Sequence, residues 1–160
     1  MKTLSNILVV GLAAVMSYMA FADEGKVPYP DNYRSWAHVK SMVIKDGHPL
    51  ENPFKGVDHV YANPKAHRGM VDGNYVDGSV LVFDLLNYQE KDNTIQEGER
   101  KLVGIMHKDA KKYAKTGGWG FEAFAKSSKT QRLANDGGMS CFACHTPQKD
   151  SDYVFSQLRK

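Results

Sequence analysis

The amino-acid sequence predicts an α+β fold in which an antiparallel β-sheet dominates and the helices are short. Runs rich in β-branched and aromatic residues are separated by short connectors that contain glycine, as in an antiparallel sheet. No stretch after residue 22 shows the long 3.6-residue periodicity that a bundle of helices needs. These two observations favour one β-rich domain over a four-helix bundle.

The chain begins, over residues 1–22, with the pattern of a secretory signal peptide. Lys2 supplies a positive charge, an almost wholly apolar run follows it, and Ala20 and Ala22 stand where signal peptidase reads small side chains. A retained membrane anchor is the alternative, but a spanning helix needs about 20 apolar residues and this run is shorter. We therefore expect a periplasmic domain over residues 23–160, with no attachment to the membrane after cleavage.

Five later segments have the composition of strands. In the segment 77–86, alternation places Leu81, Phe83 and Leu85 on one face and two valines on the other. Because both faces are apolar, this strand is expected in the middle of the sheet. The other four predicted strands are residues 38–44, 56–64, 100–108 and 119–127.

The predicted helices are short and each has a recognisable end signal. Asn63 is expected to cap a helix over residues 64–73. Residues 109–115 have room for a helical turn or two before a glycine pair, and Ser140 is expected to cap a last helix. The polar segment 89–100 is expected to be a flexible loop.

The two cysteines of the chain lie close together near its end, in the sequence Cys141-Phe142-Ala143-Cys144-His145. This C-x-x-C-H spacing is the attachment signal for c-type haem. Two intervening residues let one helical turn present both sulfurs to one edge of the porphyrin, and the histidine then lies beneath the iron. We predict one haem c per chain on a C-terminal helix, attached through Cys141 and Cys144, with His145 as the axial ligand of the iron.

Three other uses of a close cysteine pair fit the sequence less well. A redox-active C-x-x-C usually lies early in a βαβ unit, and this one lies near the C-terminus. A structural zinc site needs four ligands, and the chain has no second cysteine pair. A plain short-loop disulfide would not need the histidine.

The sixth coordination position of the iron is expected to be open. No Met or His follows His145, so a second protein ligand must come from upstream. Each upstream candidate fits a structural role better: Met42 and Met106 lie in apolar runs, and the histidines lie beside polar residues or turns. The candidates are Met42, Met70, Met106, His38, His48, His59, His67 and His107.

The charge distribution limits the classes of molecule that this chain is expected to bind. The formal net charge is +3, and it falls to +2 when Lys2 is removed with the signal peptide. Charges of both signs are interspersed without a basic stripe, which argues against nucleic acid as a partner. Arg34, Lys129 and Arg132 are candidates to hold the haem propionates, but surface cations are common and an ordinary surface role explains each of them better.

Five segments occur along the chain in the order found in one known family: YPDNYRSWAHV, FKGVDHVYANP, YVDGSVLVFDLL, GGWGFEAF and CFACH. In these segments the chain resembles the cytochrome P-460 domain family, and within it the cytochrome c′-β branch. The resemblance implies a largely antiparallel β fold, a homodimer and one covalently held high-spin haem.

One position separates the branches of that family. In the branch that oxidises hydroxylamine, a lysine in the segment matching SVLVFDLL is cross-linked to the porphyrin. Phe83 stands at the matching position here, and no lysine lies between Gly78 and Tyr88. The resemblance then implies that Phe83 and Phe54 cap the distal face of the haem. From the residues alone, a role as core aromatics explains both better, because the alternation of the strand already accounts for Phe83.

An open iron beneath phenyl rings favours small neutral ligands, because anions lose hydration in such a pocket and bound O2 needs a hydrogen-bond donor. We therefore expect binding of NO and CO, with NO buffering or scavenging as a possible role, rather than an enzyme. The enzymatic alternative, oxidation of hydroxylamine or NO or the handling of peroxide, needs a proton-transfer group over the iron. Electron transfer with a periplasmic redox partner is the other alternative. The acidic residues on the predicted strands are Asp58, Asp84 and Glu122, of which Asp84 points away from Phe83.

Overall fold

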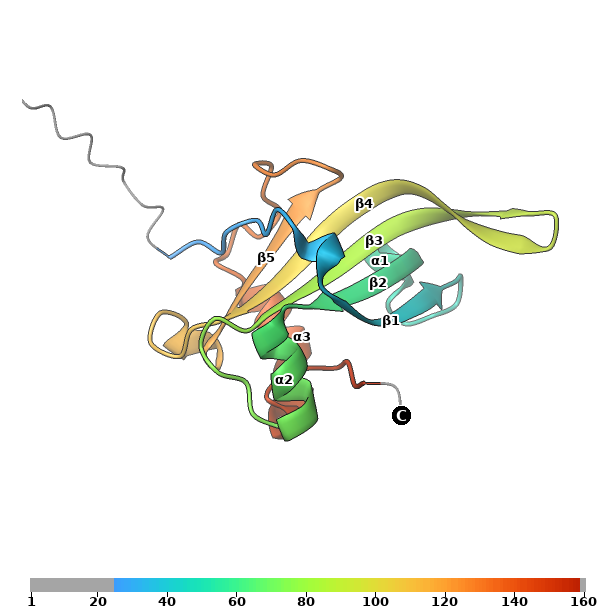
Figure 1. Cartoon of the computed structure of the whole chain (residues 1–160). Coiled ribbons are helices and arrows are strands. Elements are labelled where there is room, and N and C mark those ends of the chain that lie inside the picture. Colours follow the sequence, from blue (N-terminus) through green and yellow to red (C-terminus); the bar gives the residue numbers. More distant parts are fainter. Residues whose placement is uncertain (1–24, 159–160) are drawn as a thin grey trace, which may run out of the picture.

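The computed structural model describes residues 25–158 of the chain. Its strands form one antiparallel sheet in which neighbours in sequence are neighbours in space, in the order β1-β2-β3-β4-β5 (Figure 1). The predicted β-dominated fold is confirmed, and the strand expected in the middle of the sheet is the central strand β3. The strands are β1 (Ala37–Ile44), β2 (Gly56–Ala62), β3 (Val80–Lys91), β4 (Thr94–Lys108) and β5 (Trp119–Ala125).

Three short α-helices connect or follow the strands: α1 (Glu51–Phe54), α2 (Pro64–Asp72) and α3 (Met139–His145). The second of them begins as predicted, because the side chain of Asn63 accepts a hydrogen bond of 2.8 Å from the amide of Ala66. It ends at Gly73, whose φ of 72° closes the helix in the left-handed conformation. A six-residue 3₁₀ helix, Thr146–Ser151, continues directly from α3.

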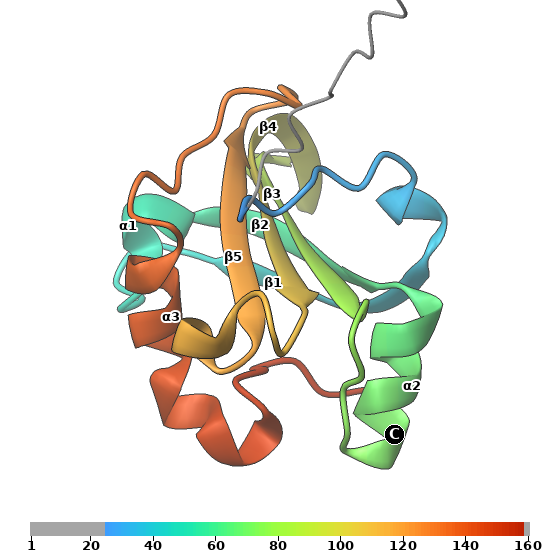
Figure 2. The same cartoon turned by 90° about the vertical axis from the view of Figure 1, so that its left-hand side faces the viewer.

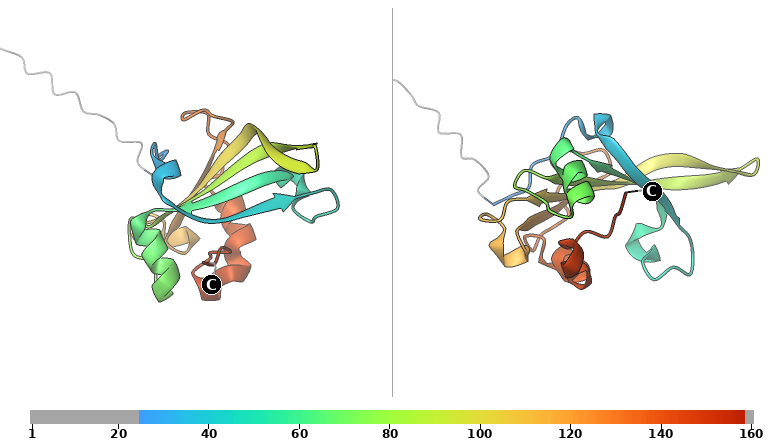
Figure 3. Two further views of the ribbon diagram at one scale, coloured as in Figure 1. Left: turned by 45° about the vertical axis from the view of Figure 1, so that its right-hand side comes forward. Right: turned by 60° about the horizontal axis from the view of Figure 1, so that its bottom comes forward.

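The two faces of the sheet are covered by different parts of the chain (Figures 1 and 2). Residues of α2, α3 and the C-terminal segment pack on one face, which we call the helical face. Residues 25–36 pass over the other, which we call the N-terminal face. Figure 3 shows α2 and α3 projecting from the same side of the sheet.

Side-chain alternation along β3 divides its residues between these faces as predicted. Leu81 and Phe83 join the core of the helical face, whereas Val80 and Val82 join the core of the N-terminal face. The buried core of the helical face comprises Val39, Val60, Ala62, Ala66, Tyr75, Leu81, Met106, Trp119, Phe121 and Val154. That of the N-terminal face comprises Val27, Tyr33, Val82, Val103, Ile105, Tyr113 and Phe124.

The prediction of a flexible loop over residues 89–100 is wrong. β3 and β4 continue through this segment as a long hairpin that reaches beyond the rest of the sheet (Figure 1). Its turn is Asp92-Asn93, with φ values of 51° and 57°, and two left-handed residues in a row suit a tight hairpin turn. Because this part of the hairpin has no core beneath it, its side chains are exposed and lack the apolar alternation that marks a buried strand.

The turn predicted over residues 109–115 is present and leads into a 3₁₀ helix, Ala114–Thr116, that Gly117 closes with a φ of 66°. Within residues 25–158, no helix is both long and apolar enough to cross a lipid bilayer. The signal peptide predicted over residues 1–22 lies outside the residues that the structure describes.

Candidate haem-binding site

α3 carries all three residues of the C-x-x-C-H motif, and a local hydrogen-bond network fixes where it begins. The carboxylate of Asp136 accepts hydrogen bonds from the amides of Gly138 and Ser140, each 2.9 Å long. The helix is therefore capped by Gly138, with a φ of 85°, and the prediction that Ser140 is the cap is wrong. Hydrogen bonds lower the pKa of the Asp136 carboxyl below its usual value. The largest effect comes from the Ser140 side chain, and the amides of Ser140 and Gly138 add to it.

Gly138 also lets α3 approach the sheet closely. A Cβ atom at this position would lie 2.7 Å from the backbone oxygen of Phe121 in β5, closer than real Cβ contacts allow. The left-handed φ and this short approach both require glycine. The start of α3 is thus held against the last strand, on the helical face.

The three motif side chains differ in their exposure. Cys141 is half-buried against the core of the helical face, Cys144 is exposed, and both are free thiols. The imidazole of His145 lies between the rings of Phe121 and Phe155, with centroid distances of 5.0 and 4.9 Å. Two sulfurs one helical turn apart beside a histidine give the donor set that a c-type haem needs.

The tautomer of His145 is fixed by its backbone partner. Its Nδ1 lies 2.7 Å from the carbonyl oxygen of Tyr153, and since a carbonyl only accepts, Nδ1 carries the proton. Burial lowers the pKa of this imidazole, and the hydrogen bond to Tyr153 opposes the shift only partly, so the ring is neutral near pH 7. Nε2 therefore presents a lone pair, which is the form that ligates iron.

One cross-strand row on the helical face of the sheet is apolar and includes a glycine. Phe83 on β3, Gly104 on β4 and Ala123 on β5 lie in one cross-strand row. At Gly104 a Cβ would make only ordinary contacts, the nearest being 3.5 Å from the Cβ of Phe83, so no clash requires glycine at this position.

Two phenyl rings come together beside this row. Phe54 at the end of α1 packs edge-on against Phe83, with ring centroids 5.9 Å apart and planes at 90°. Lys101 of β4 holds α1 in place, because its ammonium group donates hydrogen bonds to the carbonyls of Pro53 (2.9 Å) and Lys55 (2.6 Å) on either side of Phe54. The two rings that the sequence singled out as a pair are thus in contact, on the helical face.

The family model for cytochrome P-460 matches residues 30–156. The chain belongs to the cytochrome P-460 family. A search of curated proteins gives no match. Membership of this family implies a haem cofactor. The neutral imidazole of His145 and the two free thiols of α3 fit such a group.

The upstream residues that could compete as a second iron ligand are spread over the molecule. Met106 is buried in the core of the helical face, and Met70 packs against that core from α2. Met42 pairs with Asp58 at the edge of the same face and is 37% exposed. His38 and His59 lie together with Ser41 on the N-terminal face, so they are turned away from the motif.

The other three upstream histidines lie in three different parts of the fold. His107 lies beside Tyr113 of the N-terminal face, with ring centroids 6.2 Å apart. His48 accepts a hydrogen bond of 3.0 Å from the amide of Leu50 in the turn before α1. His67 is half-buried on α2. Within the described residues, no cluster of three or more His, Cys, Asp or Glu side chains is placed to hold a metal ion.

The three acidic residues singled out in the sequence fall on different faces. Asp84 lies on the N-terminal face, as predicted, where it accepts hydrogen bonds from Tyr33, Arg34 and Arg100. Burial alone would raise the pKa of Asp84, but the hydrogen bonds from Arg100, Arg34 and Tyr33 lower it below its usual value. Glu122 pairs with Arg132, also on the N-terminal face. Asp58 alone of the three shares the face of Phe83, through the register of β2 with β3.

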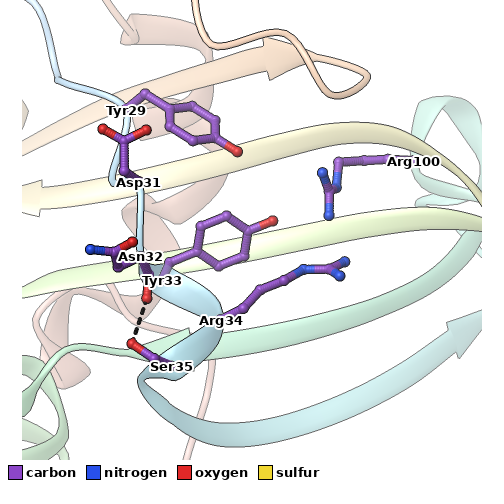
Figure 4. Close-up of a pocket in the computed structure, with 7 residues that line it drawn as sticks. All are labelled: Tyr29, Asp31, Asn32, Tyr33, Arg34, Ser35 and Arg100. Atoms are coloured by element: carbon purple, nitrogen blue, oxygen red, sulfur yellow. Dashed lines mark hydrogen bonds between the residues drawn. The ribbon is translucent and has the colours of Figure 1, made fainter.

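A pocket of about 530 Å³ lies on the N-terminal face, away from the motif (Figure 4). Its guanidinium groups, Arg34 and Arg100, are both engaged with Asp84. The other two cations considered for the haem propionates also form ion pairs on this side of the sheet: Lys129 with Asp31, and Arg132 with Glu122. All three cations considered for the propionates are thus paired with carboxylates on this side of the sheet. The pocket is lined by Tyr29, Asp31, Asn32, Tyr33, Arg34, Ser35 and Arg100.

Proposed function

We propose that this member of the cytochrome P-460 family is a periplasmic c-type cytochrome that binds NO and CO at a haem face capped by phenylalanine. The observation that carries the proposal is the contact between Phe54 and Phe83 on the face where α3 presents the C-x-x-C-H motif. Cys141 and Cys144 would hold the haem covalently, and Nε2 of His145 would ligate its iron. The haem supplies the metal that binds the gas; the chain supplies its anchorage and its selectivity.

Selectivity follows from the chemistry of the cap. Phe54 and Phe83 offer no hydrogen-bond donor, so a bound ligand that accumulates negative charge gains nothing from them. Anions lose hydration on entering such surroundings, whereas NO and CO are neutral and small. The rings must move before any ligand fits, so they restrict access by bulk. Buffering or scavenging of NO is the role that this selectivity suits.

A hydroxylamine-oxidising enzyme is the alternative within the family. In that branch a lysine stands where this chain has Phe83, and the described strand β3 has no lysine until its last residue, Lys91, far along the hairpin. Asp58 is the acidic side chain on the helical face that such chemistry would use. Mass spectrometry of the intact holoprotein separates the two functions, because the enzyme requires a protein–haem bond beyond two thioethers.

The direct test of gas binding is spectroscopic. The purified holoprotein is reduced with dithionite, and absorption spectra are recorded before and after addition of NO or CO. A shift of the Soret band with each gas supports the proposal, and unchanged spectra with both contradict it. The same sample, in a sizing experiment, tests the homodimer that the family resemblance implies.

A further inference from the structure

Asp58 is a buried carboxylate without a partner. Its side chain is 0% exposed, and neither of its oxygens has a hydrogen-bond partner. Asp84, on the other face of the same sheet, is equally buried but accepts from two arginines and a tyrosine. Folded proteins rarely leave a buried polar group unpaired, and those that remain deserve a functional explanation.

The position of Asp58 puts it beside the proposed haem cap. In the register of β2 with β3, Asp58 lies opposite Leu85, and the next pair on the same face is Val60 with Phe83. Asp58 is therefore a diagonal neighbour of Phe83, within reach across the strands. Its own strand follows α1, which carries Phe54.

Few charges act on this carboxylate. Among the described residues, they are Lys40, which shares the helical face at the edge strand β1, and His59, which is adjacent in β2 and points to the other face. β3 presents Leu85 at this point. Burial raises the pKa of Asp58 to about 6, against the opposing effects of Lys40 and His59. A group in this range changes its charge readily when a nearby charge changes.

We propose that Asp58 is the proton-linked group of the haem site, which takes up a proton when the iron is reduced and releases it when the iron is oxidised. The electron comes from an external one-electron reductant and converts ferric to ferrous iron; the proton comes from solvent and ends on the carboxylate. No other bond is made or broken. The reason is electrostatic: reduction removes one positive charge from a poorly solvated region, which makes a nearby negative carboxylate less favourable. The inference rests on the haem being held by Cys141, Cys144 and His145, and not on gas binding.

The sign of the effect is fixed by linkage. Where Asp58 is ionised in the ferric state and protonated in the ferrous state, the midpoint potential falls as pH rises. The steepest slope for one proton per electron is about 59 mV per pH unit, the potential equivalent of a tenfold change in equilibrium constant. At lower pH, where Asp58 is protonated in both the ferric and the ferrous state, the midpoint potential no longer depends on pH and reaches a plateau.

The test is a redox titration of the holoprotein at several pH values between 4.5 and 8.5, roughly the range around the pKa of a raised carboxyl. In the wild type we expect a falling potential across part of this range. Asp58→Asn should remain near the low-pH plateau of the wild type at every pH. The matched control is Asp31→Asn, which removes an exposed carboxylate paired with Lys129 on the N-terminal face and should keep the wild-type slope.

The proposal is overturned if the midpoint potential of Asp58→Asn falls with pH as steeply as that of the wild type. This holds whether the two curves coincide or differ by the same shift at every pH. If this variant does not load haem, the wild type still decides the matter by reduced-minus-oxidised infrared difference spectra in H2O and D2O. A carboxylic-acid band that appears on reduction and shifts in D2O supports the proposal, and its absence contradicts it. NO and CO spectra recorded on the same wild-type sample report separately on the proposed gas binding.

Discussion

Lys101 provides the sharpest test of the phenylalanine cap, because it holds α1 without touching the proposed haem site. Its ammonium group bridges the carbonyls of Pro53 and Lys55, at 2.9 and 2.6 Å. Lys101→Met removes both hydrogen bonds and keeps an aliphatic side chain of similar length. Phe54 then keeps its edge contact with Phe83 and the backbone hydrogen bonds of α1, among them the 3.1 Å bond from its own amide to the carbonyl of Leu50.

The magnitude follows from the two lost hydrogen bonds. Each contributes about 0.5–1.5 kcal/mol, and the ordinary value applies because both accepting residues are exposed. If about 1–2 kcal/mol of this favours the closed position of α1, the open population rises about 5- to 30-fold in the variant. Ligand entry that requires Phe54 to move accelerates by the same factor.

Flash photolysis of the ferrous CO complex measures this rate directly. We expect a faster second-order rebinding rate in Lys101→Met, restoration toward the wild-type rate in Lys101→Arg, and no change in Lys45→Met. The last variant removes an exposed pair with Glu90 close to the same loop and serves as the control. A rate in Lys101→Met equal to that of the wild type refutes the idea that α1 gates the site.

Three further predictions concern the cap, the N-terminal face and the motif. Phe83→Ala should raise the CO association rate about tenfold or less, because the aromatic edge contact contributes about 0.5–1.5 kcal/mol; the same photolysis experiment measures it. Asp84→Asn should lower the free energy of unfolding by about 3 kcal/mol at pH 7, because it leaves Arg100 poorly paired in a largely buried site, and urea denaturation tests this. Since the pKa of Asp84 is lowered by folding, the difference from wild type should shrink as pH falls below about 4, the unfolded value, and disappear below the folded value. Cys144→Ser should leave at most one thioether, seen as a changed α-band and as partial loss of haem mass from the denatured chain.

The parts of the fold that could be predicted are those that local chemistry determines. The apolar alternation of Leu81, Phe83 and Leu85 against the valines identified β3 as a central strand, because the pleat sends alternate side chains to opposite faces. The cap at Asn63 was also predictable, since its side chain bonds to an amide within one helical turn. C-x-x-C-H identified the candidate site for the same reason, as its spacing matches one turn of helix.

The parts that failed depend on contacts that the sequence does not display. The hairpin around Asp92-Asn93 has no core beneath it, so burial leaves no pattern on its residues. The carboxylate of Asp136, which precedes two glycines, binds the first amides of α3. Ser140 is a common capping residue and lies nearer the motif, so the sequence pointed to it instead. The link from Lys101 to α1 joins distant segments, and no local signal announces it. Asp58 was recognisable as an acidic strand residue, but its isolation is a property of the packed sheet.

Electron paramagnetic resonance of the ferric holoprotein near neutral pH tests the central claim most directly, because spin state reports whether a strong-field protein ligand occupies the sixth position of the iron. We predict a high-spin signal, from an iron held by His145 with an open face beneath Phe54 and Phe83. A purely low-spin signal would mean that a second side chain, such as Met70 or Met106, has reached the iron, and it would contradict the account.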